Sequence, residues 1–97
     1  MKINTKQTLK TLEGTPFKIA ESKDLTLGFV ISEALSISKT SGAMKLYSLT
    51  LKMLGDEADV DASDLILIKN EIEITERWVA IIKGQSLLML EEVKETK

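Results

Sequence analysis

The stretch GDEADVDASDLILIKNEI, residues 55–72, decides how the middle of this chain folds. Five acidic residues fall between Asp56 and Asp64, and four apolar residues follow them without interruption. A calcium loop, an acidic docking patch and the start of a helix all compete for such a pattern. The local spacing favours the start of a helix.

The residues from Val60 to Leu65 match the positions of a helix N-terminus. With Asp61 as the N-cap, Asp64 occupies the third helical position, where its carboxylate completes a capping box. Val60 and Leu65 then stand at the two positions of a hydrophobic staple. Additional acidic residues favour the positive end of the helix dipole. The sequence therefore predicts a helix over residues 62–73.

The calcium interpretation fails on spacing. A loop that began at Asp59 would place Asp64 where the turn needs glycine, and Asn70 where the ion needs a bidentate glutamate. We therefore expect no metal site here.

The N-terminal segment alternates with a period of two. Lysine-bearing positions alternate with β-branched or apolar positions, as they do in half-exposed strands. Gly14 and Pro16 predict a turn within it, so we expect a β-hairpin over residues 2–20. Apolar residues recur with helical spacing in the rest of the chain. These patterns predict further helices over 25–38, 42–54 and 76–93, the last of them capped by Thr75.

Together these elements predict an α+β fold in one domain, residues 1–97, with an N-terminal β-hairpin packed on a bundle of about four helices. Helix 42–54 is apolar around most of its circumference, as helices buried on two sides are. The last helix carries a second apolar stripe in addition to its core face. We expect self-association and take as the candidate oligomer interface Ile81, Gly84 and Leu88.

Composition excludes several chemistries. The 97 residues contain no Cys and no His, which excludes disulfides, thiolate nucleophiles, Cys-ligated zinc and catalysis by Ser-His-Asp or Cys-His. No Gly-rich phosphate-binding motif is present. We expect no cofactor and no enzymatic activity. No apolar run approaches the roughly 20 residues that span a bilayer, and the N-terminus has no apolar signal core. The predicted location is the cytoplasm.

Charge is unevenly distributed although the net charge is only −2. Residues 56–76 contain eight acidic residues and one lysine, whereas basic residues dominate residues 1–24. The acidic stretch is the candidate surface for docking a protein, through Asp56, Glu57, Asp59, Glu73 and Glu76. Under the alternative of an anionic ligand, the candidate contacts are Lys2, Lys6, Lys10 and Lys45.

Three stretches together resemble small accessory proteins encoded by phages and prophages: KDLTLGFVISEAL (23–35), DVDASDLILIKNEIE (59–73) and WVAIIKGQSLLMLEE (78–92). The shared patterns concern packing and capping and carry no catalytic residue. The chain departs from the family pattern in lacking a proline near Arg77. The resemblance implies a compact accessory protein made in a bacterial cytoplasm during infection or lysogeny.

The leading functional prediction is a non-enzymatic accessory protein that binds another protein, as a host-factor inhibitor or an assembly factor, and forms a homo-oligomer. Two alternatives stay open. One is an oligomeric sponge for a small anionic, nucleotide-type ligand, and the other is a nucleic-acid-binding protein that uses the same lysines.

Overall fold

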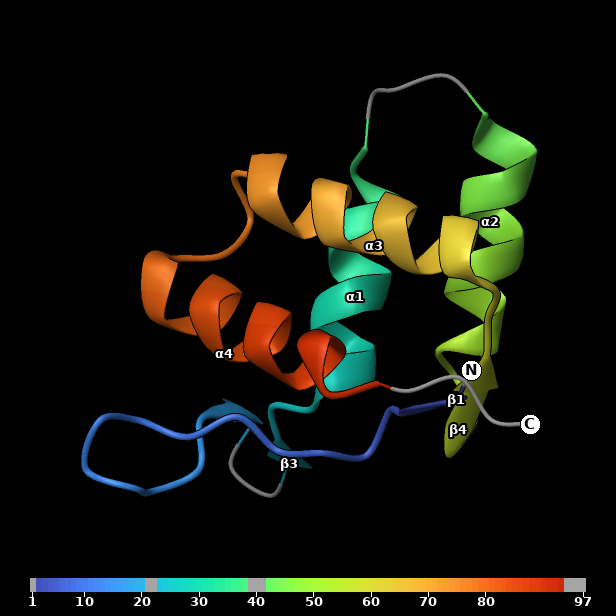
Figure 1. Cartoon of the computed structure of the whole chain (residues 1–97). Helices are drawn as coiled ribbons and strands as arrows, with labels where there is room; N and C mark the ends of the chain where they lie inside the picture. The colour runs from blue at the N-terminus through green and yellow to red at the C-terminus, as the bar shows by residue number, and fades with distance from the viewer. Residues whose placement is uncertain (1, 21–22, 39–41, 94–97) are drawn as a thin grey trace.

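The computed structural model describes residues 2–20, 23–38 and 42–93 (Figure 1). Its elements follow the chain in the order β1 (Lys2–Asn4), β2 (Lys18–Ala20), β3 (Lys23–Asp24), α1 (Leu27–Ser36), α2 (Ala43–Lys52), β4 (Glu57–Asp59), α3 (Ala62–Ile74) and α4 (Ala80–Glu91). Short antiparallel strand pairs and four helices thus make up the described part of the chain, which confirms the predicted α+β class. None of these helices combines the length and the apolar character needed to cross a bilayer.

Helix α1 lies at the centre of the fold and packs against both α2 and α3, while α4 packs against α3 (Figure 1). The helix begins at Thr26, whose hydroxyl accepts a hydrogen bond from the backbone N–H of Phe29 at 3.3 Å. Six of its ten residues are buried, and only Ser36 is exposed; the buried residues are Leu27, Gly28, Val30, Ile31, Ala34 and Leu35. The central helix is therefore the one that the other elements enclose.

The first strand pairs with β4, about 55 residues further along the chain, and brings the N-terminus to the entrance of α3. In this antiparallel pair Ile3 lies opposite Ala58, and both side chains are buried. The predicted hairpin over 2–20 is therefore shorter than expected. The chain reverses at Gly14, whose φ is +91°, and Lys10 bridges to Pro16 across the turn. At the end of the predicted hairpin that lies far from the turn, β1 pairs with β4 instead, because this pairing buries Ile3 in the core.

Three backbone segments meet in a closed ring beside this turn. The N–H of Leu9 donates to the carbonyl of Leu25 at 2.9 Å, and the N–H of Leu25 donates to Phe17 at 2.7 Å. The N–H of Phe17 closes the ring on the carbonyl of Leu9 at 2.9 Å. The strands β2 and β3 extend the pairing between Phe17 and Leu25, with Lys18 opposite Asp24. The ring joins the N-terminal turn to the segment that enters α1.

Glycine is required at position 28 by a close approach of backbones. The N–H of Gly28 donates to the carbonyl of Thr5 at 2.9 Å. A Cβ atom at this position would lie 2.8 Å from Cβ of Thr5 and 3.0 Å from the carbonyl oxygen of Met53. The first turn of α1 can therefore contact both the N-terminal segment and the end of α2 only without a side chain.

The last helix begins later than predicted. Thr75, expected to cap a helix over 76–93, is the C-cap of α3, and α4 starts only at Ala80. The hydroxyl of Thr75 accepts a hydrogen bond from the N–H of Arg77 at 3.2 Å and shapes the connection. The connection places Trp78 in the core, where its indole N–H donates to the carbonyl of Val30 at 3.1 Å. The need to bury and satisfy this indole explains the non-helical segment.

The predicted start of α3 is confirmed. The Asp61 carboxylate accepts from the N–H of Asp64 at 2.8 Å, and the Asp64 carboxylate accepts from the N–H of Asp61 at 3.3 Å. This is the reciprocal capping box expected from the sequence. Val60 and Leu65, the two residues of the expected staple, are both buried in the core.

Candidate interaction surfaces

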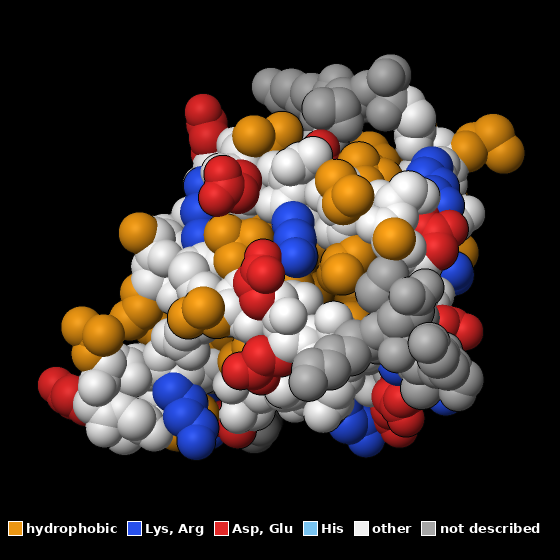
Figure 2. Space-filling view, viewed as in Figure 1, with side chains coloured by type: hydrophobic (Ala, Val, Ile, Leu, Met, Phe, Trp, Pro, Cys, Tyr) orange, Lys and Arg blue, Asp and Glu red, His pale blue; other side chains and the backbone are white. Residues whose placement is uncertain are grey.

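Helix α2 has two apolar faces, and the fold covers only one of them. Leu46, Leu49 and Met53 point into the core. An outer stripe follows the other side of the helix and continues into the turn after it. It is exposed, or half-exposed at Leu51, and consists of Met44, Tyr47, Leu51 and, in the turn, Leu54. Figure 2 shows hydrophobic side chains at the surface over several elements, including the region of α2. The four residues are spaced three, four and three apart, the spacing of a helix–helix seam.

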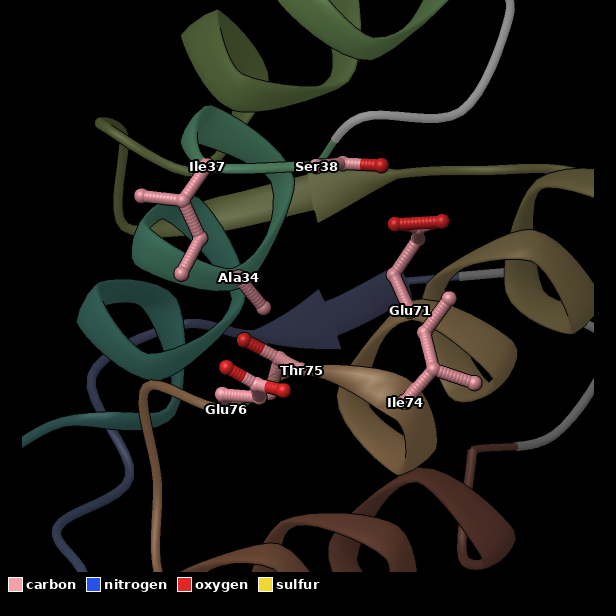
Figure 3. Close-up of a pocket in the computed structure, with 7 residues that line it drawn as sticks. All are labelled: Ala34, Ile37, Ser38, Glu71, Ile74, Thr75 and Glu76. Carbon is pink, nitrogen blue, oxygen red and sulfur yellow. The ribbon is translucent and has the colours of Figure 1, made fainter.

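A pocket of about 460 Å³ lies between the C-terminal ends of α1 and α3. In Figure 3 residues at the end of α1 form one wall, while residues of α3 and the connection after it form the others. Ile37 and Ile74 give the pocket an exposed apolar surface. Glu71 and Glu76 add a buried and an exposed carboxylate. The pocket therefore suits a group that is apolar with a positive charge beside it.

The predicted docking residues divide between two places. Asp56, Glu57 and Asp59 lie in or beside β4, before α3 begins. Glu73 and Glu76 lie at or just beyond the last turn of α3. Both groups are exposed, but only Glu76 lines the pocket.

The acidic residues near β4 meet lysines of the same chain. Lys6 Nζ lies 3.1 Å from an Asp56 carboxylate oxygen, and Lys2 lies opposite Asp59 in the strand pair. Lys52 Nζ donates to the carbonyl oxygen of Asp59 at 3.1 Å. The surface around β4 is therefore one of mixed charge, which weakens its attraction for a basic partner.

A lysine on α2 connects that helix to the capping box. Lys45 Nζ lies 2.5 Å from the buried carboxylate of Asp64. Hydrogen bonding to Asp64 raises the pKa of Lys45, with desolvation opposing it. The backbone N–H of Asp64 is the main cause of the lowered pKa of Asp61. Since Lys6 and Lys45 are engaged by carboxylates, the four predicted anion contacts do not form one open cluster.

The predicted stripe on α4 lies beside the N-terminal segment. Gln85, which lies between Ile81 and Leu88 on this face of the helix, accepts a hydrogen bond from the N–H of Lys10 at 2.9 Å and donates one to the Lys10 carbonyl. Ile81 is partly buried against the core, whereas Gly84 and Leu88 are exposed. The chain itself thus occupies part of this stripe, and its role as an oligomer interface stays a prediction.

The pocket between α1 and α3 was not foreseen from the sequence. Its lining joins residues 34–38 to residues 71–76, and no local pattern indicates that these segments meet. Within the described residues, no group of three or more acidic residues is arranged to hold a metal ion. Comparison with known protein families, with curated proteins and with solved structures found no match to this chain.

Proposed function

We propose that this chain is a non-enzymatic accessory protein, of the phage or prophage kind, that acts in the bacterial cytoplasm by binding another protein through the pocket between α1 and α3. The observation that carries the proposal is the pairing of apolar and acidic lining in one open pocket of about 460 Å³. A partner that fits it presents an apolar side chain flanked by Lys or Arg on a helix or an extended segment.

The exposed apolar side chains on the pocket wall support binding to a partner. Ile37 is 49% exposed and Ile74 is 63% exposed, and both belong to the lining. Grouped apolar residues with a polar rim are typical of protein interaction sites. The exposed carboxylate of Glu76 beside them then favours a positive charge on the partner.

The test is capture from a bacterial cytoplasmic extract with the wild-type chain and two charge-matched variants. Glu76→Lys reverses a charge at the pocket, and Glu57→Lys reverses one on β4, before the opposite end of α3. We expect a protein to be retained by the wild type and by Glu57→Lys and to be lost with Glu76→Lys. Ile74→Ala should weaken the same capture because it removes apolar contact area.

Other results would contradict the proposal. If only Glu57→Lys loses the captured protein, the partner binds at β4 and not at the pocket. Retention of nucleic acid or of a small anion in place of a protein would favour one of the alternatives. If the wild type retains no protein from the extract, the proposal is wrong.

A further inference from the structure

We infer that the outer stripe of α2 is the interface of a homodimer, in which the α2 helices of two copies pack against each other in antiparallel orientation. This inference is independent of the pocket and of its partner. It rests on the spacing, the flanking residues and the exposed area of the stripe.

The stripe is complementary to itself. Met44, Tyr47, Leu51 and Leu54 are arranged symmetrically about position 49, with Leu54 in the turn that follows the last helical residue, Lys52. When two copies run antiparallel about a two-fold axis at this height, Met44 of one copy meets Leu54 of the other, and Tyr47 meets Leu51. A two-fold interface requires one patch to match itself in this way. Antiparallel packing also places the helix dipoles in opposition, which is favourable.

The residues on either side of the stripe allow a second helix to approach closely. They are small and uncharged: Ala43, Ser48, Thr50 and Gly55. The two lysines of the helix bind groups of their own chain, Lys45 at Asp64 and Lys52 at the Asp59 carbonyl. A second copy therefore brings no like charge to the seam. A strongly charged partner would find no complementary charge there.

The exposed apolar area of the stripe supplies a large part of what a dimer interface buries. Met44 is 88% exposed, Tyr47 66%, Leu51 48% and Leu54 75%. These four side chains present on the order of 500 Å² per chain, a large share of the roughly 800 Å² that each partner buries in a standard interface. The flanking small residues extend the contact on both sides.

The first test measures mass by light scattering over a range of protein concentrations. We expect the wild type to weigh two chains and Met44→Glu/Leu54→Glu to weigh one, with an unchanged circular dichroism spectrum. Leu88→Glu, on the exposed α4 stripe, is the matched control and should stay dimeric. A wild type that weighs one chain at every concentration would overturn the inference, as would dissociation by Leu88→Glu alone.

Orientation is tested by a charge pair across the seam. In Met44→Glu/Leu54→Lys, antiparallel packing brings each new glutamate to a new lysine of the other copy, so the dimer should form again. Parallel packing would instead place like charges together, and the mass would stay at one chain.

Cross-linking decides the matter if the charged variants fail to fold. Since the chain has no Cys, each variant carries one thiol. Ser48→Cys lies beside its own counterpart in the antiparallel pair and should oxidise rapidly to a covalent dimer, whereas Met44→Cys should do so at least tenfold more slowly. Faster cross-linking through Met44→Cys would indicate parallel helices. Slow oxidation of both thiols would overturn the interface.

Discussion

Helices α1 and α2 have ten residues each and both carry many apolar side chains, yet one is enclosed and the other is half open. Around α1 the chain provides a neighbour for nearly every face: the N-terminal segment contacts Gly28, and the indole of Trp78 contacts the Val30 carbonyl. Around α2 it covers only the inner face. The apolar content of a helix therefore indicates how much of its surface must be buried, but not whether the same chain or a partner buries it.

The largest expected effect separates the two faces of α2. Leu49→Ala removes a side chain that is only 1% exposed and should lower the free energy of unfolding by about 2–5 kcal/mol. Met44→Ala, at a position that is 88% exposed, should change it by less than roughly 0.5 kcal/mol. Urea unfolding at protein concentrations low enough to keep the chain monomeric measures both. Similar losses for the two variants would contradict the division of the helix into two faces.

The close fit of α1 is tested at its glycine. Gly28→Ala forces a Cβ atom against Thr5 and the Met53 carbonyl, so we expect a net loss of about 1–3 kcal/mol from overpacking, although alanine is the better helix former. Gly84→Ala in α4 is the matched control. Apart from its chain neighbours and its own helix backbone, no heavy atom of the described residues lies within 4 Å of the added Cβ, and the variant should gain roughly 0.5–1 kcal/mol. The two changes should therefore have opposite signs in urea unfolding, and a stabilising Gly28→Ala would disprove the close contact.

The indole of Trp78 offers a finer test of the enclosure of α1. Trp78→Phe keeps an aromatic ring beside Phe29, whose ring centroid lies 6.0 Å from that of Trp78, but removes the hydrogen bond to Val30. The expected cost is on the order of 1 kcal/mol for the hydrogen bond, in addition to the smaller volume of the ring. Thermal unfolding followed by circular dichroism measures it, because the variant lacks the tryptophan signal. A variant as stable as the wild type would show that the hydrogen bond contributes nothing.

The smallest effect concerns the cap of α3, which is linked to α2 through Lys45. Because the pKa of Asp61 is lower in the folded chain than its usual value of 3.8, its ionised form stabilises the fold at pH values above about 4. This contribution disappears as the pH falls through the folded pKa. Relative to Asp61→Asn, the wild type should therefore lose stability as the pH falls below about 4. Melting temperatures of the two proteins across this range provide the measurement, and a difference that does not vary with pH would contradict it.

The features that the sequence predicted well are local. The capping box from Asp61 to Asp64 spans four residues, so its geometry follows from residue types at fixed spacing. In contrast, the alternating pattern of the N-terminus predicts pairing within a hairpin over residues 2–20, whereas β1 pairs with β4. The pairing of Ile3 with Ala58 depends on a strand edge that lies far away in the sequence, so no local pattern predicts it.

The candidate sites were harder to predict for the same reason. The acidic residues near β4 were visible in the sequence, but the lysine that neutralises Asp56 comes from a segment 50 residues away. Thr75 matched the pattern of an N-cap, although burial of Trp78 delays the helix to Ala80. The wide apolar arc of residues 42–54 was recognised, but only the fold shows which half of it stays open.

The ring of hydrogen bonds through Leu9, Phe17 and Leu25 has a consequence for hydrogen exchange. Each residue donates to one neighbour and accepts from the other, so opening any one segment breaks two of the three bonds. Any two of the three amide protons should therefore lose protection in the same opening event, so we expect all three to be protected from exchange to a similar degree. Successive members of the ring are eight residues apart, so short loops close it, and we expect this part of the protein to form early in folding.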